Sequence, residues 1–117
     1  MKVQVRLIIL SDYNDKVYVN TDVNLFPFME LNDEQPINVA VSILERVCGV
    51  KCLPFEFVIS NHIYTEDGIL YITYGIFIPY NINNQDNKYK MVELNEFCGR
   101  IQNEMDKKIV SEMQYML

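Results

Sequence analysis

The stretch FMELNDEQPINVAVSILERVCGV, residues 28 to 50, decides the fold, because it predicts a turn followed by a helix with both ends marked. The acidic residues from Glu30 to Glu34 would place negative charge at the helix N-terminus, where the helix dipole attracts it. Pro36 suits the first helical turn, and Gly49 suits the left-handed residue that ends a helix. The sequence therefore predicts a helix between Pro36 and Gly49.

The predicted helix is apolar around most of its circumference. Its polar side chains are few, namely Asn38, Ser42, Glu45 and Arg46. Its aliphatic residues are Ile37, Val39, Ala40, Val41, Ile43, Leu44 and Val47. A helix with so little polar surface is expected to be covered on more than one side.

This stretch resembles the signature segment of the Nudix hydrolase superfamily, which is a loop, a helix and a second loop. The family pattern is a glycine, five residues, a glutamate, seven residues, Arg-Glu, an aliphatic, any residue, Glu-Glu, any residue, a glycine and an aliphatic. Without gaps, four positions of this frame are met, by Glu34, Leu44, Gly49 and Val50. The order of the predicted elements around the segment is similar as well. The resemblance implies an α/β fold of the α+β kind, a mixed β-sheet between helices, with residues 1–117 as a single domain.

The residues that carry catalysis in the family are mostly replaced. Phe28 stands in place of the first glycine, Ser42 and Ile43 in place of Arg-Glu, and Arg46 and Val47 in place of the glutamate pair. In the family, glutamates on this helix face hold magnesium ions that bridge the substrate diphosphate and activate water. Aliphatic side chains cannot ligate Mg²⁺, and an arginine repels it. The resemblance therefore implies that ordinary Nudix hydrolysis is lost, and we expect no metal site and no cofactor.

A divergent enzyme is the alternative. In this interpretation Glu34 and Glu45 are the candidate catalytic carboxylates of a hydrolase that acts with Mg²⁺ on a nucleoside diphosphate derivative. Carboxylates outside the segment would have to complete the site, and the candidates are Glu56, Glu66, Asp67 and Glu93. Glu45 occupies a position that the family leaves free, and Glu34 alone is a poor metal site.

An apolar face on the helix predicts a protein interface. Phe28, Ile43 and Val47 would be its anchors, covered by a second copy of the chain or by another protein. We therefore expect a homodimer or a complex with a protein partner.

A retained nucleotide cleft is a second kind of binding site. Arg6 and Arg46 are the candidate cations for a diphosphate, and Phe28 and Tyr74 are candidate aromatic residues for stacking on a base. Packing of the aromatic residues in the core is the plainer explanation of the same pattern.

Composition and charge exclude other partners. The 117 residues carry a formal net charge of −6, and 50% of them are hydrophobic. Scattered lysines and arginines on an acidic chain do not favour nucleic-acid backbones or anionic membranes. No apolar run is long enough to span a bilayer, so a cytoplasmic protein is expected. An odd number of cysteines, three, fits reduced thiols.

Strand patterns flank the central segment. Alternating apolar residues predict strands over residues 3–10, 16–20, 55–59 and 69–80. Ile63 and Tyr64 indicate either a continuation of the third strand or a second short strand over 61–65, and a tight turn at Glu66-Asp67-Gly68 makes a hairpin with 69–80. Residues 91–94 resemble the short strand that leads into the last helix of the Nudix family. The polar stretch 81–90 is either a specificity loop or, more simply, a surface connection.

The last part of the chain predicts a single amphipathic helix. Phe97, Ile101, Met105 and Ile109 recur every four residues from Asn95 onward. Gly99 would weaken this helix, and a strand passing close by would explain its presence.

Overall fold

Six strands and three helices follow one another in the computed structural model, which describes residues 1–11, 16–20, 26–53, 56–78 and 88–115. In chain order they are β1 (Lys2–Ser11), β2 (Lys16–Asn20), β3 (Phe28–Glu30), α1 (Pro36–Cys48), β4 (Ile59–Glu66), β5 (Ile69–Ile78), β6 (Tyr89–Glu93), α2 (Leu94–Arg100) and α3 (Glu104–Gln114). No helix in these ranges is long and apolar enough to cross a bilayer.

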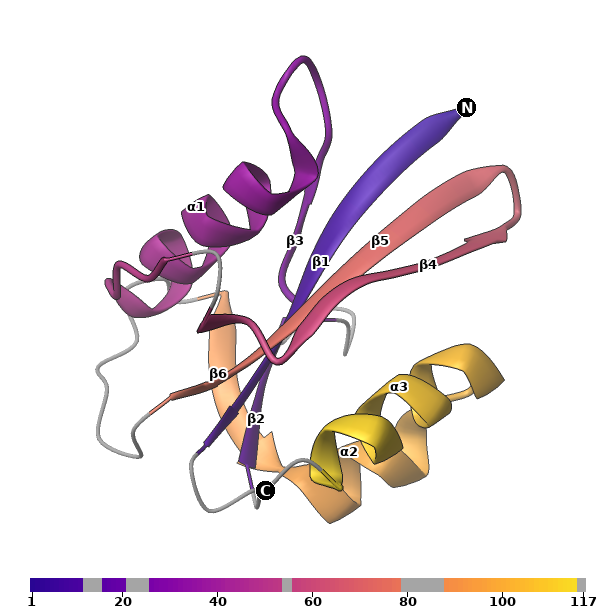
Figure 1. Ribbon diagram of the computed structural model, residues 1–117. Helices are drawn as coiled ribbons and strands as arrows, with labels where there is room; N and C mark the ends of the chain where they lie inside the picture. The colour runs from indigo at the N-terminus through magenta and orange to yellow at the C-terminus, as the bar shows by residue number, and fades with distance from the viewer. Residues whose placement is uncertain (12–15, 21–25, 54–55, 79–87, 116–117) are drawn as a thin grey trace.

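The strands form one mixed sheet in the order β4-β5-β1-β2-β6, and β3 pairs with β1 beside this path (Figure 1). The centre is the parallel pair β1 and β5, which stay in register from Lys2 opposite Ile69 to Ser11 opposite Ile78. The other pairs are antiparallel. The predicted mixed sheet and the predicted pairing of the first two strands are therefore confirmed.

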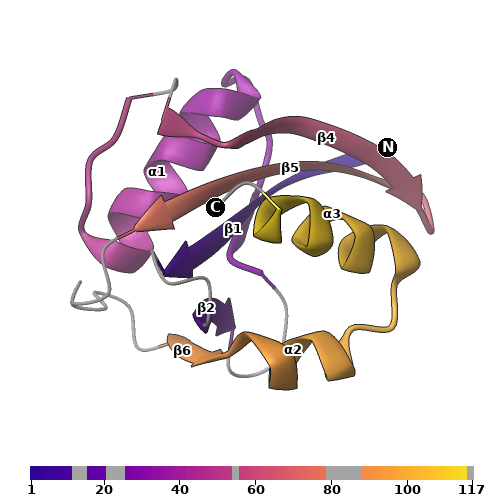
Figure 2. The ribbon, with the colours of Figure 1, turned by 60° about the horizontal axis from the view of Figure 1, so that its bottom comes forward.

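Helices cover both faces of this sheet, α1 on one side and α2 and α3 on the other (Figures 1 and 2). Strand β1 is buried from Val5 to Ser11 because its side chains alternate between these two layers. Leu7 and Ile9 pack in the core on the α1 side, whereas Ile8 and Leu10 pack with side chains of α2 and α3. The sheet between helices predicted for this chain is confirmed.

Helix α1 begins and ends where the sequence predicts. Pro36 lies in its first turn, and Gly49 adopts the left-handed conformation, with φ of 70° and its N–H donating to the Glu45 carbonyl. The acidic residues do not cap it, because the first turn has no acidic residue and Gln35 at the N-cap makes no capping hydrogen bond. The buried face of α1 is also narrower than predicted. One stripe is buried, formed by Val39, Ala40, Ile43, Leu44, Val47 and Cys48, and the opposite side is exposed.

The predicted hairpin is present, and its turn has the expected backbone. Thr65 pairs with Leu70 and Glu66 with Ile69, which leaves Asp67 and Gly68 as the two turn residues. Both have positive φ, 52° and 78°, as a turn of the I′ kind requires. Strand β4 spans Ile59–Glu66, so the strand indicated over 61–65 is confirmed, whereas residues 56–58 are not part of a strand, contrary to the prediction. Strand β3 was not predicted. The stretch 79–87, which includes most of the candidate specificity loop, lies outside the described residues.

The predicted C-terminal helix is two helices. Ile101 and Asn103 have extended backbones, with ψ of 121° and 123°, and separate α2 from α3. Asn103 caps α3, because its side-chain oxygen accepts a hydrogen bond from the Asp106 N–H at 3.1 Å. The explanation given for Gly99 is wrong, since a Cβ at Gly99 would meet nothing within 4 Å.

Candidate functional site

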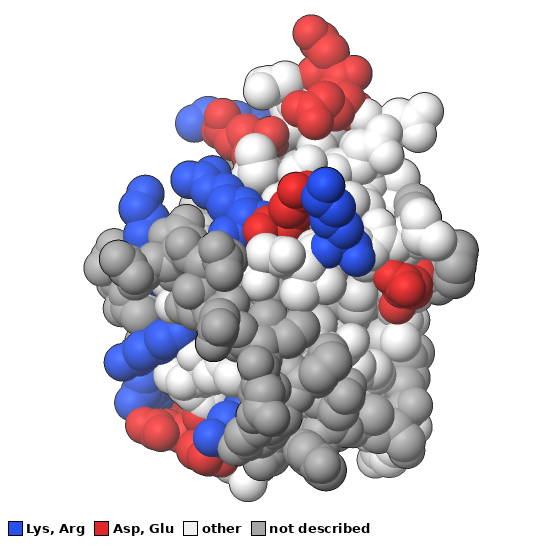
Figure 3. Space-filling model, turned by 90° about the vertical axis from the view of Figure 1, so that its left-hand side faces the viewer, with Lys and Arg blue, Asp and Glu red and all other residues white. Residues whose placement is uncertain are grey.

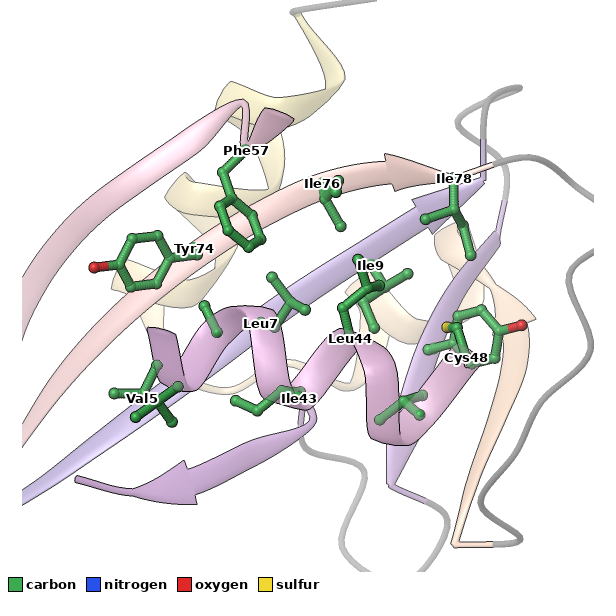
Figure 4. Close-up of a cluster of buried hydrophobic side chains, with 14 of the residues drawn as sticks. Val5, Leu7, Ile9, Ile43, Leu44, Cys48, Phe57, Tyr74, Ile76 and Ile78 are labelled. Atoms are coloured by element: carbon green, nitrogen blue, oxygen red, sulfur yellow. The ribbon is translucent and has the colours of Figure 1, made fainter. Parts of the chain in front are cut away.

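The helix face on which the Nudix pattern places glutamates is closed by the sheet of the same chain. Ile43 is 2% exposed and Val47 is 1% exposed, and both belong to the core on the α1 side. Figure 4 shows Ile43 and Leu44 reaching from α1 toward β1, beside Val5, Leu7 and Ile9. The prediction that Ile43 and Val47 anchor an interface is therefore wrong, because no apolar face remains there for a partner to cover.

The residues at these positions do not fit a magnesium ion. Ile43 and Val47 carry no donor atoms, and Arg46, which is exposed, carries a positive charge. Mg²⁺ requires oxygen ligands in near-octahedral geometry. Within the described ranges, no group of three or more His, Cys, Asp or Glu side chains could hold a metal ion.

The candidate catalytic carboxylates lie apart from this face and from one another. Glu34 is exposed in the segment before α1, and Glu45 is exposed on the outer side of α1, where it is 3.9 Å from the Lys51 ammonium. Glu56 accepts a hydrogen bond from the Leu53 N–H, and Glu66 contacts Asn103. On the side of the molecule where α1 lies, acidic and basic side chains are interspersed (Figure 3).

Arg6, predicted to bind a diphosphate, is committed to a buried ion pair. Its guanidinium is 2.7 Å and 3.1 Å from the two carboxylate oxygens of Asp106 in α3, and it also donates to the Thr73 hydroxyl. The Tyr64 hydroxyl donates to the same carboxylate at 2.9 Å. Arg6 is only 3% exposed, so the guanidinium is held by its own chain and is not presented to a ligand.

Aromatic rings surround this ion pair. The Arg6 guanidinium carbon lies 4.7 Å from the ring centre of Tyr71, 5.4 Å from that of Tyr64 and 5.6 Å from that of Phe26. These distances are within the range of cation–π attraction. Burial raises the pKa of Tyr64, so its hydroxyl stays protonated and continues to donate to Asp106 at neutral pH. The cluster fastens α3 to β1, β4 and β5.

Tyr74, the aromatic candidate for stacking, lies on the other face of the sheet. It is 4% exposed in the core on the α1 side, and its ring centre is 5.5 Å from that of Phe57. Burial raises its pKa. Phe28 is half-buried in β3, opposite Arg6 in the strand register. The predicted nucleotide-binding residues are therefore divided between the two faces of the sheet: Phe28 is the cross-strand neighbour of Arg6, whereas Tyr74 faces α1.

The polar partners of Arg6, namely Asp106, Thr73 and Tyr64, were missed by sequence reasoning, although Asp106 carries a signal. Asp106 occupies the same helix face as Ile109, Val110 and Met113, which are fully buried. A carboxylate within a buried apolar stripe predicts a buried cation beside it, because an unpaired buried charge is costly. Arg6 gives no such signal, because it continues the polar positions Lys2 and Gln4 of the alternating pattern in β1.

A second buried polar pair joins β2 to α1. Tyr18 and Cys48 are both buried and share a hydrogen bond. Burial raises the pKa of the Cys48 thiol from 9.0 to about 11, and the bond with Tyr18 lowers it in part. The three cysteines are free thiols, as predicted.

Comparison with solved structures identifies the fold. No protein-family model matches the sequence, and no curated protein matches it. The chain superposes on a MutT structure from work on Aliivibrio salmonicida and Vibrio cholerae with a TM-score of 0.70 and 14% identity, covering 93% of this chain and 94% of that chain. For the Caenorhabditis elegans Ap4A hydrolase the TM-score is 0.65 and the identity 10%, over 99% and 98% of the two chains.

Another similar structure was solved as a complex with a protein. It is the C-terminal domain of mouse MUTYH with human PCNA, and its TM-score is 0.69 at 11% identity, over 98% of this chain and 90% of that chain. The similarity at such low identity is a similarity of fold, and it extends over nearly the whole chain, as the resemblance in residues 28–50 implied. The chain has the fold of the Nudix hydrolases.

Proposed function

We propose that residues 1–117 form one Nudix-fold domain that has lost metal-dependent diphosphate hydrolysis and acts as a protein-interaction module. One observation carries this proposal: Ile43 and Val47 fill the core at two of the three helix positions where the Nudix pattern places glutamates, and the exposed Arg46 occupies the third. Restoring a metal site there would require burying carboxylates against Val5 and Leu7, which is costly unless a cation is bound.

Two further observations favour protein over nucleotide as the ligand. The arginine best placed by the sequence for a diphosphate, Arg6, is already paired with Asp106. The candidate stacking residue Tyr74 is buried on the opposite side of the sheet. In addition, a domain of the same fold, from mouse MUTYH, was solved in complex with PCNA, so the fold is compatible with binding a protein.

A hydrolysis assay tests the loss of catalysis. Purified protein is incubated with Mg²⁺ or Mn²⁺ and a panel of dinucleoside polyphosphates and ADP-ribose, beside an active Nudix hydrolase as the positive control. We expect no product above that of the Glu34→Gln variant. In a calorimetric titration with Mg²⁺, we expect the unchanged protein and the Glu34→Gln variant to give the same heats.

The alternative, a divergent hydrolase, predicts the opposite outcome. Metal-dependent turnover that Glu34→Gln or Glu45→Gln abolishes would refute the proposal. Tight binding of ADP-ribose without metal would instead favour a nucleotide-binding module, and an Arg46→Gln variant would then show whether that arginine contacts the ligand.

A further inference from the structure

We draw no further inference here: the strongest candidate, the pocket between the end of β4 and the N-terminus of α3, carries none, because its two carboxylates are already engaged within the chain, Glu66 by Asn103 and Glu104 by Lys107, and nothing else among the described residues points to a ligand there.

Discussion

Arg6 of β1 and Asp106 of α3 form a bidentate ion pair in the core, 100 residues apart in the chain. The two side chains are almost completely shielded from water. The pair connects the central strand of the sheet to α3, and Tyr64 and Thr73 supply further hydrogen bonds. In a domain of this size, such a contact has large consequences for stability.

Asp106→Ala should destabilise the protein strongly. Among the described residues it leaves the buried Arg6 guanidinium with Thr73 as its hydrogen-bond acceptor and without a counterion, and losing one member of a buried pair costs about 3–5 kcal/mol. Urea unfolding followed by circular dichroism measures the change. Glu104→Ala, which removes the exposed pair with Lys107 on the same helix, is the control and should cost less than about 1 kcal/mol.

Replacing both members of the pair separates charge from packing. In Arg6→Met combined with Asp106→Leu, the uncompensated charge is absent, so the double variant should recover much of the stability that Asp106→Ala loses. If the double variant were as unstable as the single one, the hydrogen bonds and ring contacts of Arg6 would matter more than the charge.

Substitution of Ile43 should change stability and leave the mass unchanged. Ile43→Ala removes a side chain that packs against β1, which should cost about 2–5 kcal/mol. Ile43→Glu should be worse, because it buries a carboxylate without a partner. Ser42→Glu, one position away on the exposed side, should be near neutral in urea unfolding. Equal, small effects of Ile43→Glu and Ser42→Glu would contradict the burial of this face.

Stability should fall between pH 9 and pH 11 because of Cys48. Its thiol has a pKa of about 11 in the folded protein and 9.0 ordinarily, so the unfolded chain loses this proton first. The stabilisation is fully present below pH 9 and is lost as the pH rises through about 11, at less than about 1.4 kcal/mol per pH unit. Unfolding midpoints measured across this interval should decline less steeply in Cys48→Ala. Identical slopes would argue against the raised thiol pKa.

Replacement by alanine should have opposite effects on stability at two glycines. Gly68 has φ of 78° in the β4–β5 turn, so Gly68→Ala should cost about 1 kcal/mol through backbone strain alone, since its Cβ would meet nothing within 4 Å. Gly99 lies in α2 with the same free space, and Gly99→Ala should stabilise by about 0.5–1 kcal/mol. Thermal unfolding of the two variants provides the comparison. The turn interpretation fails if both shift the midpoint in the same direction.

Local patterns predicted those parts of the fold that local chemistry controls. The ends of α1 follow from Pro36 and Gly49, and the hairpin follows from Asp67 and Gly68. The break between α2 and α3 was missed because the four-residue spacing continues through Ile101, whereas the extended backbone before Asn103 is set by the cap and by the docking of Asp106. Strand β3 was missed because Phe28 to Glu30 become a strand only by pairing with β1.

The candidate site was harder to predict than the fold. The replacement of the family's catalytic residues correctly marked Ile43 and Val47 as unusual. Whether such residues face a partner or the core of their own chain depends on the three-dimensional packing. Arg6 looked available because a cation in a strand gives no sign of a counterion 100 residues later. Pairing across such a separation is a property of topology, which periodicity does not encode.

The parallel pairing of β1 with β5 also governs when the protein can fold during synthesis. Translation releases β1 first, and its apolar residues must wait until β5 has left the ribosome, while Arg6 has no counterion until α3 emerges. The nascent chain therefore exposes the apolar residues of β1 until β5 emerges, a state that chaperones bind. Newly made protein should depend on them more than its small size suggests.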